Sequence, residues 1–277
     1  MSDLVDFIYL GPPKTASTWL YECLKSHPEI QASKDGETYF FDIYYGRGTQ
    51  WYMDTQFPQN HEGRLRIDCG PTYAYNPLAL ERIHKHNPKM KLSIGLRNPI
   101  ERAFSHYWHV KKKSLVSLNF DQSLEDYTAF WAWMKTSMVS YGLKKSFALF
   151  GRENVHVMMF DDIKKSPETT LNDVFGFLDI DQNFVPSARD KKINVAGPKH
   201  SLAQRTTYKL AKSVLGEDTL MKKAAHNPFF AKISGKNEYV RGVDPEFEAI
   251  LQEIFEPEIS ALETLLDIDL NHWRSHT

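Results

Sequence analysis

The hydrophobic positions of this chain follow two alternating patterns. Short runs that indicate buried strands cover residues 7–10, 64–68, 91–96 and 155–160. Segments whose apolar residues recur every three or four positions indicate helices at 18–26, 77–86, from 99 onward, 141–150, 167–178 and 245–266. Strands that alternate with helices are typical of an α/β fold with a largely parallel sheet.

The chain of 277 residues contains no internal repeat and no low-complexity linker, which favours a single domain. Its hydrophobic share of 42% is ordinary for a globular protein with a sizeable core. The formal net charge of −1 gives no overall attraction to nucleic acid or membrane. Any site for an anion must therefore be local.

Two cysteines, Cys23 and Cys69, are too few for a disulfide framework and fit a reducing compartment. The N-terminus lacks the basic and apolar stretches of a signal peptide. No run approaches the roughly 18 apolar residues of a membrane helix. We therefore expect a cytoplasmic protein without membrane insertion, and the sequence leaves homo-oligomer formation open.

The most informative segment follows the first expected strand. Residues 11–19 read Gly-Pro-Pro-Lys-Thr-Ala-Ser-Thr-Trp and lead into a helix. Free N–H groups at a helix start bind anions, and the helix dipole favours negative charge there. Lys14 adds a positive charge. Hydroxyl donors come from Thr15, Ser17 and Thr18.

The spacing of this segment departs from the P-loop of nucleoside-triphosphate enzymes. That loop needs a glycine directly before its lysine, whereas Lys14 follows Pro13. A site for a magnesium nucleoside triphosphate is therefore disfavoured. An ordinary strand, turn and helix without a ligand is the other interpretation of the segment.

A second strand-to-helix junction repeats this chemistry. Residues 96–107 read Leu-Arg-Asn-Pro-Ile-Glu-Arg-Ala-Phe-Ser-His-Tyr. Arg97 lies where the strand ends, and a guanidinium there can bind a phosphate through two hydrogen bonds. Ser105 follows about two helical turns later. From the residues alone, Arg97 could equally pair with a carboxylate and Ser105 could face solvent.

Together the two segments resemble the cofactor-binding motifs of sulfotransferases that use 3′-phosphoadenosine 5′-phosphosulfate (PAPS). The first is similar to the 5′-phosphosulfate loop of that family and the second to its 3′-phosphate motif, in the family's order. The resemblance implies that Arg97 and Ser105 contact the 3′-phosphate. It assigns the 5′-phosphosulfate side of the cofactor to Pro13, Lys14, Thr15, Ala16, Ser17, Thr18 and Trp19. In the family the tryptophan packs against adenine, and a plain core position is the alternative for Trp19.

The resemblance covers nearly the whole chain, since residues 255–273 look like the C-terminal helix of many bacterial sulfotransferases. It implies a P-loop-like three-layer α/β fold with a central, mainly parallel sheet flanked by helices, as one domain over residues 1–277. It also implies that 114–140 and 195–240 are insertions that cover the acceptor or the cofactor. Candidate contributors to the 3′-phosphate site within the second insertion are Lys199 and Arg205.

Sulfuryl transfer needs in-line positioning, charge stabilisation and a base. The resemblance implies that Lys14 stabilises the charge on the leaving phosphate. Residues 34–42, Lys-Asp-Gly-Glu-Thr-Tyr-Phe-Phe-Asp, resemble the segment that carries the base in heparan-sulfate sulfotransferases, and Glu37 is the matching residue. The aromatic run after Glu37 predicts its partial burial, which would suit a base. An exposed loop glutamate is the alternative. The segment departs from the family because two residues separate Lys34 from Glu37.

Histidine is the alternative base, because cytosolic small-molecule sulfotransferases commonly use one. His106 and His109 lie on the expected helix of Ser105. The motif match makes His106 a spacer residue, so we prefer Glu37 as the base.

Residues 68–73, Asp-Cys-Gly-Pro-Thr-Tyr, look like the segment that lines the acceptor cleft of glycan sulfotransferases. Cys69 stands where that family has a lysine, which argues against heparan sulfate itself as the acceptor. We expect Asp68 to hold a nearby basic group or the acceptor. A catalytic role for the Cys69 thiol has little support.

The sequence therefore predicts a PAPS-dependent sulfotransferase that forms 3′-phosphoadenosine 5′-phosphate (PAP) as product. We expect it to act without a metal on a hydroxyl or amine of a small-molecule or glycan acceptor, preferably a glycan or an aliphatic alcohol. Two alternatives stay open: a P-loop nucleotide kinase or other phosphotransferase, and a non-catalytic nucleotide-binding protein.

Overall fold

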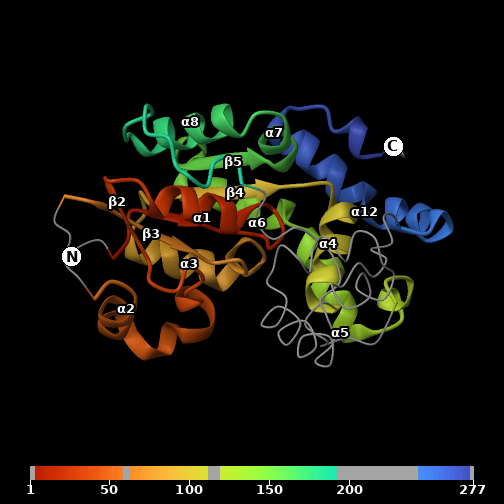
Figure 1. The fold of residues 1–277 in the computed structure, drawn as a ribbon. Coiled ribbons are helices and arrows are strands. Elements are labelled where there is room, and N and C mark those ends of the chain that lie inside the picture. Colours follow the sequence, from red (N-terminus) through yellow and green to blue (C-terminus); the bar gives the residue numbers. More distant parts are fainter. Residues whose placement is uncertain (1–3, 59–62, 112–118, 192–242, 275–277) are drawn as a thin grey trace, which may run out of the picture.

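The computed structural model describes residues 4–58, 63–111, 119–191 and 243–274. A sheet of five parallel strands runs through the middle of the molecule in the order β2-β3-β1-β4-β5 (Figure 1). Its strands are β1 (Phe7–Tyr9), β2 (Ile30–Ala32), β3 (Leu65–Cys69), β4 (Lys91–Leu96) and β5 (Val155–Met159). The predicted α/β class with a mainly parallel central sheet is confirmed.

Helices cover both faces of the sheet, with α8 on one side and α3 on the other (Figure 1). Successive residues of β1 point to opposite faces, so Ile8 packs into one core while Phe7 and Tyr9 pack into the other. The core around Ile8 includes side chains from α3 (Pro77–His86), α6 (Ser140–Phe150) and α12 (Pro245–Leu266). The core around Phe7 and Tyr9 includes side chains from α1 (Ser17–Lys25) and α8 (Pro167–Leu178). This arrangement has the three layers that we predicted.

A third core lies beside the sheet. It joins α4 (Pro99–Lys111), α5 (Tyr127–Ala129) and the first half of α12, with Trp133 and Phe255 among its buried rings. Part of the aromatic stretch expected to cover the acceptor is therefore core, since Trp133 is only 1% exposed.

Several elements were not predicted. Among them are β2, α2 (Gly48–Gln56), α5 and α7 (Phe160–Lys165). β2 is only three residues long, and α2 lacks an apolar stripe that would mark it in the sequence. Phe160, expected to end the last strand, instead begins α7. In the described ranges, no helix is long and apolar enough to cross a membrane.

The loops that follow the strands gather the candidate residues at one edge of the sheet. Lys14 follows β1, Glu37 follows β2 and Arg97 follows β4. The carboxyl ends of parallel strands lie at the same edge, and ligands bind there where the strand order reverses. β1 lies between β3 and β4 and marks that reversal.

Candidate active site

The loop between β1 and α1 is anchored from inside the protein. The Tyr9 hydroxyl donates to the Thr15 carbonyl oxygen at 3.1 Å and lies 2.7 Å from Thr15 Oγ1. Thr15 Oγ1 in turn donates to the Pro12 carbonyl oxygen at 2.6 Å. The Thr15 hydroxyl, predicted to face an anion, therefore points inward, and Thr15 is only 1% exposed.

Close packing beneath this loop requires the glycine at position 95. A Cβ atom on Gly95 would lie 2.1 Å from the Tyr9 hydroxyl oxygen and 2.6 Å from Thr15 Oγ1. Both contacts are too short for any side chain to be accommodated without moving the loop anchor. Gly95 of β4 therefore leaves the space that the Tyr9 and Thr15 hydroxyls need to anchor the loop between β1 and α1.

The backbone of the loop adopts an unusual conformation at two residues that are not glycine. Lys14 and Ala16 adopt left-handed conformations, with φ of 75° and 69°, which non-glycine residues rarely adopt without a functional reason. Ala16 caps α1 without a side-chain hydrogen bond, and the first turn of α1 carries no acidic residue. Turns of this kind at a helix N-terminus form concave anion sites.

Two arginines of the second motif bind the backbone of this loop. Arg102 Nη1 donates to the Pro13 carbonyl oxygen at 3.1 Å, and Arg97 Nη1 donates to the Lys14 carbonyl oxygen at 3.3 Å. Two segments far apart in the sequence therefore lie in contact and bring Arg97 and Arg102 to the loop of Lys14.

Arg97 is held on three sides. Besides the Lys14 carbonyl, it forms an ion pair with Glu101 at 3.0 Å, and its guanidinium lies 4.3 Å from the centre of the Phe160 ring. The carboxylate pairing that we considered as an alternative is thus present. Ser105 is half-buried on α4, and among the described residues no hydrogen bond joins it to Arg97. A phosphate at Arg97 must share the guanidinium with Glu101.

Glu37 lies on the loop after β2 and is exposed, so the predicted partial burial is wrong. The Tyr39 hydroxyl donates to Glu37 Oε2 at 2.9 Å. Burial, followed by the negative charge of Glu37, raises the pKa of Tyr39 above its ordinary value. Tyr39 therefore stays protonated at neutral pH and keeps its hydrogen bond to the carboxylate. An exposed carboxylate fixed in this way can accept a proton from a bound acceptor.

Asp68 is fully buried, so the expectation that it holds the acceptor is wrong. The hydroxyls of Thr38 and Tyr52 both donate to Asp68 Oδ2 at 2.8 Å, and the Cys69 backbone N–H donates to Oδ1 at 2.7 Å. Burial raises the pKa of Asp68 to about 7, and these hydrogen bonds oppose the rise. Since Thr38 directly follows Glu37, Asp68 supports the loop that carries the candidate base.

Replacement of Asp68 by asparagine is expected to remove a pH dependence of stability. Folding raises the pKa of Asp68 from 3.8 to about 7. The unfolded chain therefore loses this proton at a lower pH than the folded protein does. The free energy of unfolding should therefore fall as the pH rises from about 4 to about 7, by up to about 4 kcal/mol. Urea unfolding across this pH range measures the effect.

The exposed Asp54 on α2 provides the matched control for this experiment. Asp54→Asn should keep the pH slope of the wild type, whereas Asp68→Asn should flatten it. Parallel curves for the wild type and Asp68→Asn would refute the assignment.

The two cysteines are buried thiols. Burial raises the pKa of Cys23 to about 12 and that of Cys69 well above its ordinary value. Neither forms a thiolate nucleophile near neutral pH. The charge of Glu37 also contributes to the shift at Cys69, which places the candidate base close to the end of β3.

Trp19 lies in the core, 5% exposed, and its indole N–H donates to the Arg189 carbonyl oxygen at 2.9 Å. Trp19 thus occupies a core position, which we considered as the alternative to packing against adenine. Lys199 and Arg205 lie outside the described residues, as does the whole of 195–240. Within the part that is described, no group of three or more metal-binding side chains comes together.

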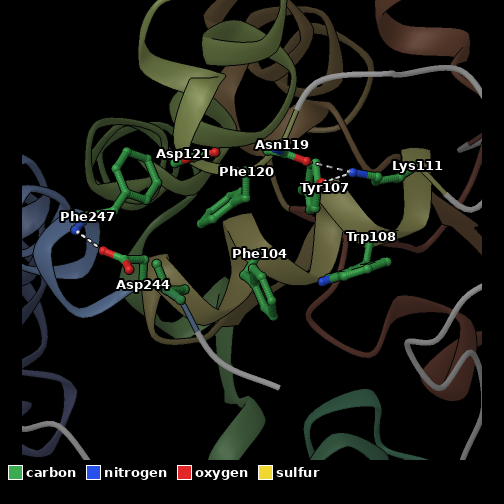
Figure 2. A pocket seen from close by; sticks show the side chains of 10 residues that line it. Phe104, Tyr107, Trp108, Lys111, Asn119, Phe120, Asp121, Asp244 and Phe247 are labelled. Atoms are coloured by element: carbon green, nitrogen blue, oxygen red, sulfur yellow. Dashed lines mark hydrogen bonds between the residues drawn. The ribbon is translucent and has the colours of Figure 1, made fainter. Parts of the chain in front are cut away.

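A separate cavity of about 230 Å³ lies between α4, residues 119–121 and the start of α12 (Figure 2). Phe104, Tyr107, Trp108 and Lys111 line it, at the spacing of one helix face. The Lys111 ammonium donates to the Tyr107 hydroxyl at 2.5 Å and lies over the Tyr107 and Trp108 rings. Neither Arg97 nor Ser105 lines this cavity, so it is distinct from the site around Arg97.

Sequence reasoning missed the supporting roles of three residues: Tyr9, Tyr52 and Arg102, of which Arg102 was recognised only as a position of the second motif. Each is fully buried or nearly so, and each contacts a partner on another element. The signal for Arg102 was its place in the second motif, next to the apolar residue Ala103 on a core-facing helix. Tyr9 and Tyr52 resemble ordinary core residues in the sequence.

The sequence profile of the sulfotransferase domain matches residues 4–262. The chain is 34% identical over 107 residues to mouse heparan sulfate glucosamine 3-O-sulfotransferase 6, a match that covers 39% of this chain and 31% of that protein. It is 29% identical over 185 residues to human heparan sulfate glucosamine 3-O-sulfotransferase 5, covering 62% of this chain and 53% of that protein. The matches thus span about a third to a half of these relatives.

Two solved structures share the fold. A sulfotransferase from Alicyclobacillus acidocaldarius superposes with a TM-score of 0.73 at 22% identity and covers 98% of this chain and 99% of its own. Mouse sulfotransferase SULT7A1, solved in complex with PAP, superposes with a TM-score of 0.50 at 16% identity, covering 92% and 85% of the two chains. At these identities the likeness concerns the fold.

Proposed function

Because the chain belongs to the sulfotransferase domain family, we propose that it transfers a sulfuryl group from PAPS to a hydroxyl or amine of an acceptor. The observation that carries this proposal is the joint site of the two motifs. Arg97 and Arg102 hold the Lys14 and Pro13 carbonyls, so two cations contact the loop before α1 at the switch point of the sheet. Such a site suits a ligand with two separate phosphate groups.

The residues at this edge fit the cofactor in number and charge. The N-terminus of α1 and Lys14 would hold the 5′ side, and Arg97 with Ser105 would hold the 3′-phosphate. When bound, PAPS supplies an activated sulfuryl group on a phosphate leaving group. Lys14 neutralises the negative charge that develops on that phosphate.

Glu37 takes the proton of the acceptor. Its carboxylate is exposed and is oriented by the Tyr39 hydroxyl. Tyr75 lies within electrostatic range of both Glu37 and Arg102, which supports a base that lies close to the cofactor loop. The acceptor hydroxyl or amine would be held between them.

We propose a glycan or an aliphatic alcohol as the acceptor. Relatives in this family act on glucosamine of heparan sulfate, as their names state. The buried Cys69 occupies the place of a family lysine, so a cation that would attract a highly charged glycan is missing at that position. A less anionic glycan or a neutral alcohol suits such a cleft.

Isothermal calorimetry with PAP and with magnesium ATP tests the cofactor assignment. We expect PAP to bind without added metal and magnesium ATP to bind much more weakly, because the loop lacks the glycine that a triphosphate loop needs. Tight, magnesium-dependent ATP binding together with no PAP binding would favour the kinase alternative instead.

A further inference from the structure

Arg102 is a buried cation at the base of the candidate phosphosulfate loop. It lies on α4 with only 1% of its surface exposed. Its Nη1 donates to the Pro13 carbonyl oxygen at 3.1 Å, while Nε donates to Ser137 Oγ at 2.6 Å and Nη2 to Thr136 Oγ1 at 2.9 Å. Nη2 also donates to the Trp133 carbonyl oxygen. One guanidinium thus joins the loop to the segment 133–137.

The charge of Arg102 has no carboxylate partner among the described residues it contacts. Its hydrogen bonds go to backbone carbonyls, hydroxyls and the ring of His106. A buried cation without a counter-charge is costly. Burial, opposed by the nearby Tyr75 and assisted by the charge of Arg97, lowers the pKa of Arg102 to about 9. Two cations that repel each other at the loop favour the arrival of an anion.

The contact with Pro13 also sets the direction of a peptide group. In a trans peptide the carbonyl and the N–H of the next residue point in opposite directions. The Pro13 carbonyl faces Arg102, so the Lys14 N–H points away from Arg102. Arg97 holds the Lys14 carbonyl and orients the Thr15 N–H in the same manner. The two arginines thus fix the orientation of two consecutive peptide groups of the loop.

We propose that Arg102 is a positioning residue for the 5′-phosphate end of the cofactor. It acts through the loop: its guanidinium fixes the peptide that presents the Lys14 N–H and adds positive charge behind that peptide. Its bonds to Ser137 and Thr136 hold the guanidinium in place. This inference rests on the proposed function, because it assumes that the loop receives the 5′ side of PAPS.

Binding of two nucleotides to the full chain tests the proposal. PAP carries both phosphates, whereas adenosine 5′-monophosphate (AMP) carries only the 5′-phosphate, and AMP affinity is measured by displacement of PAP. Arg102→Lys keeps a charge but cannot reach Pro13 and residues 133–137 together. We expect Arg102→Lys and Arg102→Met to weaken PAP and AMP by the same factor, about tenfold or more.

Ser105→Ala on the same helix is the matched control, since it should weaken PAP and leave AMP unchanged. Thermal unfolding of the ligand-free variants separates loss of binding from loss of fold, and Arg102→Lys decides the result if Arg102→Met does not fold. Wild-type affinity of Arg102→Lys for both nucleotides would overturn the proposal. So would a loss confined to PAP, which would make Arg102 a 3′-phosphate ligand. If the wild type itself binds no PAP, the result contradicts the proposed function, on which the role of Arg102 rests.

Discussion

Replacement of Lys14 by alanine is expected to reduce turnover by about 100-fold to 1,000-fold, the range typical for removal of one group that stabilises developing charge. Lys14 lies in the loop between β1 and α1, half-buried and in a left-handed backbone conformation. The effect should fall mainly on kcat, because the charge on the leaving phosphate grows in the transition state.

A steady-state assay with saturating PAPS measures this change, with PAP affinity determined in parallel by calorimetry. Lys25→Ala is the control, because Lys25 is an exposed lysine in the last turn of α1, the helix that follows the loop of Lys14. Lys25→Ala should retain wild-type turnover. A Lys14→Ala variant with unchanged kcat would remove Lys14 from the chemistry.

Replacement of Glu37 by glutamine is expected to lower kcat by about 100-fold to 10,000-fold, as for the loss of a general base. Glutamine keeps the size of the side chain and can still accept the Tyr39 hydrogen bond, but it cannot take a proton at neutral pH. PAP affinity should not change, because the exposed carboxylate lies on the loop after β2 rather than on the cofactor loop.

Glu22→Gln serves as the control for this variant, since Glu22 is an exposed glutamate on α1. It should behave as the wild type. If Glu37→Gln keeps full turnover, a different base must act, and His106→Ala and His109→Ala would then be the next variants to assay.

Several elements could be predicted from local signals alone. The bounds of α3, α8, α12 and β4 match the expected ranges. Capping residues explain this for two of the helices: Asn76 precedes Pro77 and accepts from the Leu78 and Ala79 N–H groups, and Asp244 plays the same part before Pro245. A capping side chain followed by proline marks a helix start without any knowledge of the tertiary structure.

The two anion motifs could also be predicted, because their chemistry is local to a strand end and a helix start. The contacts that join the two motifs could not be predicted. The bonds from Arg97 and Arg102 to the Lys14 and Pro13 carbonyls depend on how α4 packs against the loop. No pattern of residue types within either motif specifies that contact.

The errors concern side-chain orientation. Thr15 turns inward because Tyr9 of the preceding strand offers a hydroxyl beneath it. Asp68 is buried because Tyr52, on the unpredicted helix α2, covers it. Glu37 is exposed because the aromatic residues after it pack away into the core. Each outcome depends on a neighbour that is distant in the sequence or lies on an element the sequence did not reveal.

The central claim is that this chain moves a sulfuryl group from PAPS to an acceptor. The most direct test is transfer of ³⁵S from labelled PAPS to a panel of neutral glycans, heparan sulfate and aliphatic alcohols, with PAP formation followed at the same time. We predict that at least one acceptor becomes labelled in equal amount to the PAP released, and that Lys14→Ala and Glu37→Gln abolish both signals. Normal PAP binding with no label transferred to any acceptor would contradict the claim and favour a non-catalytic nucleotide-binding protein.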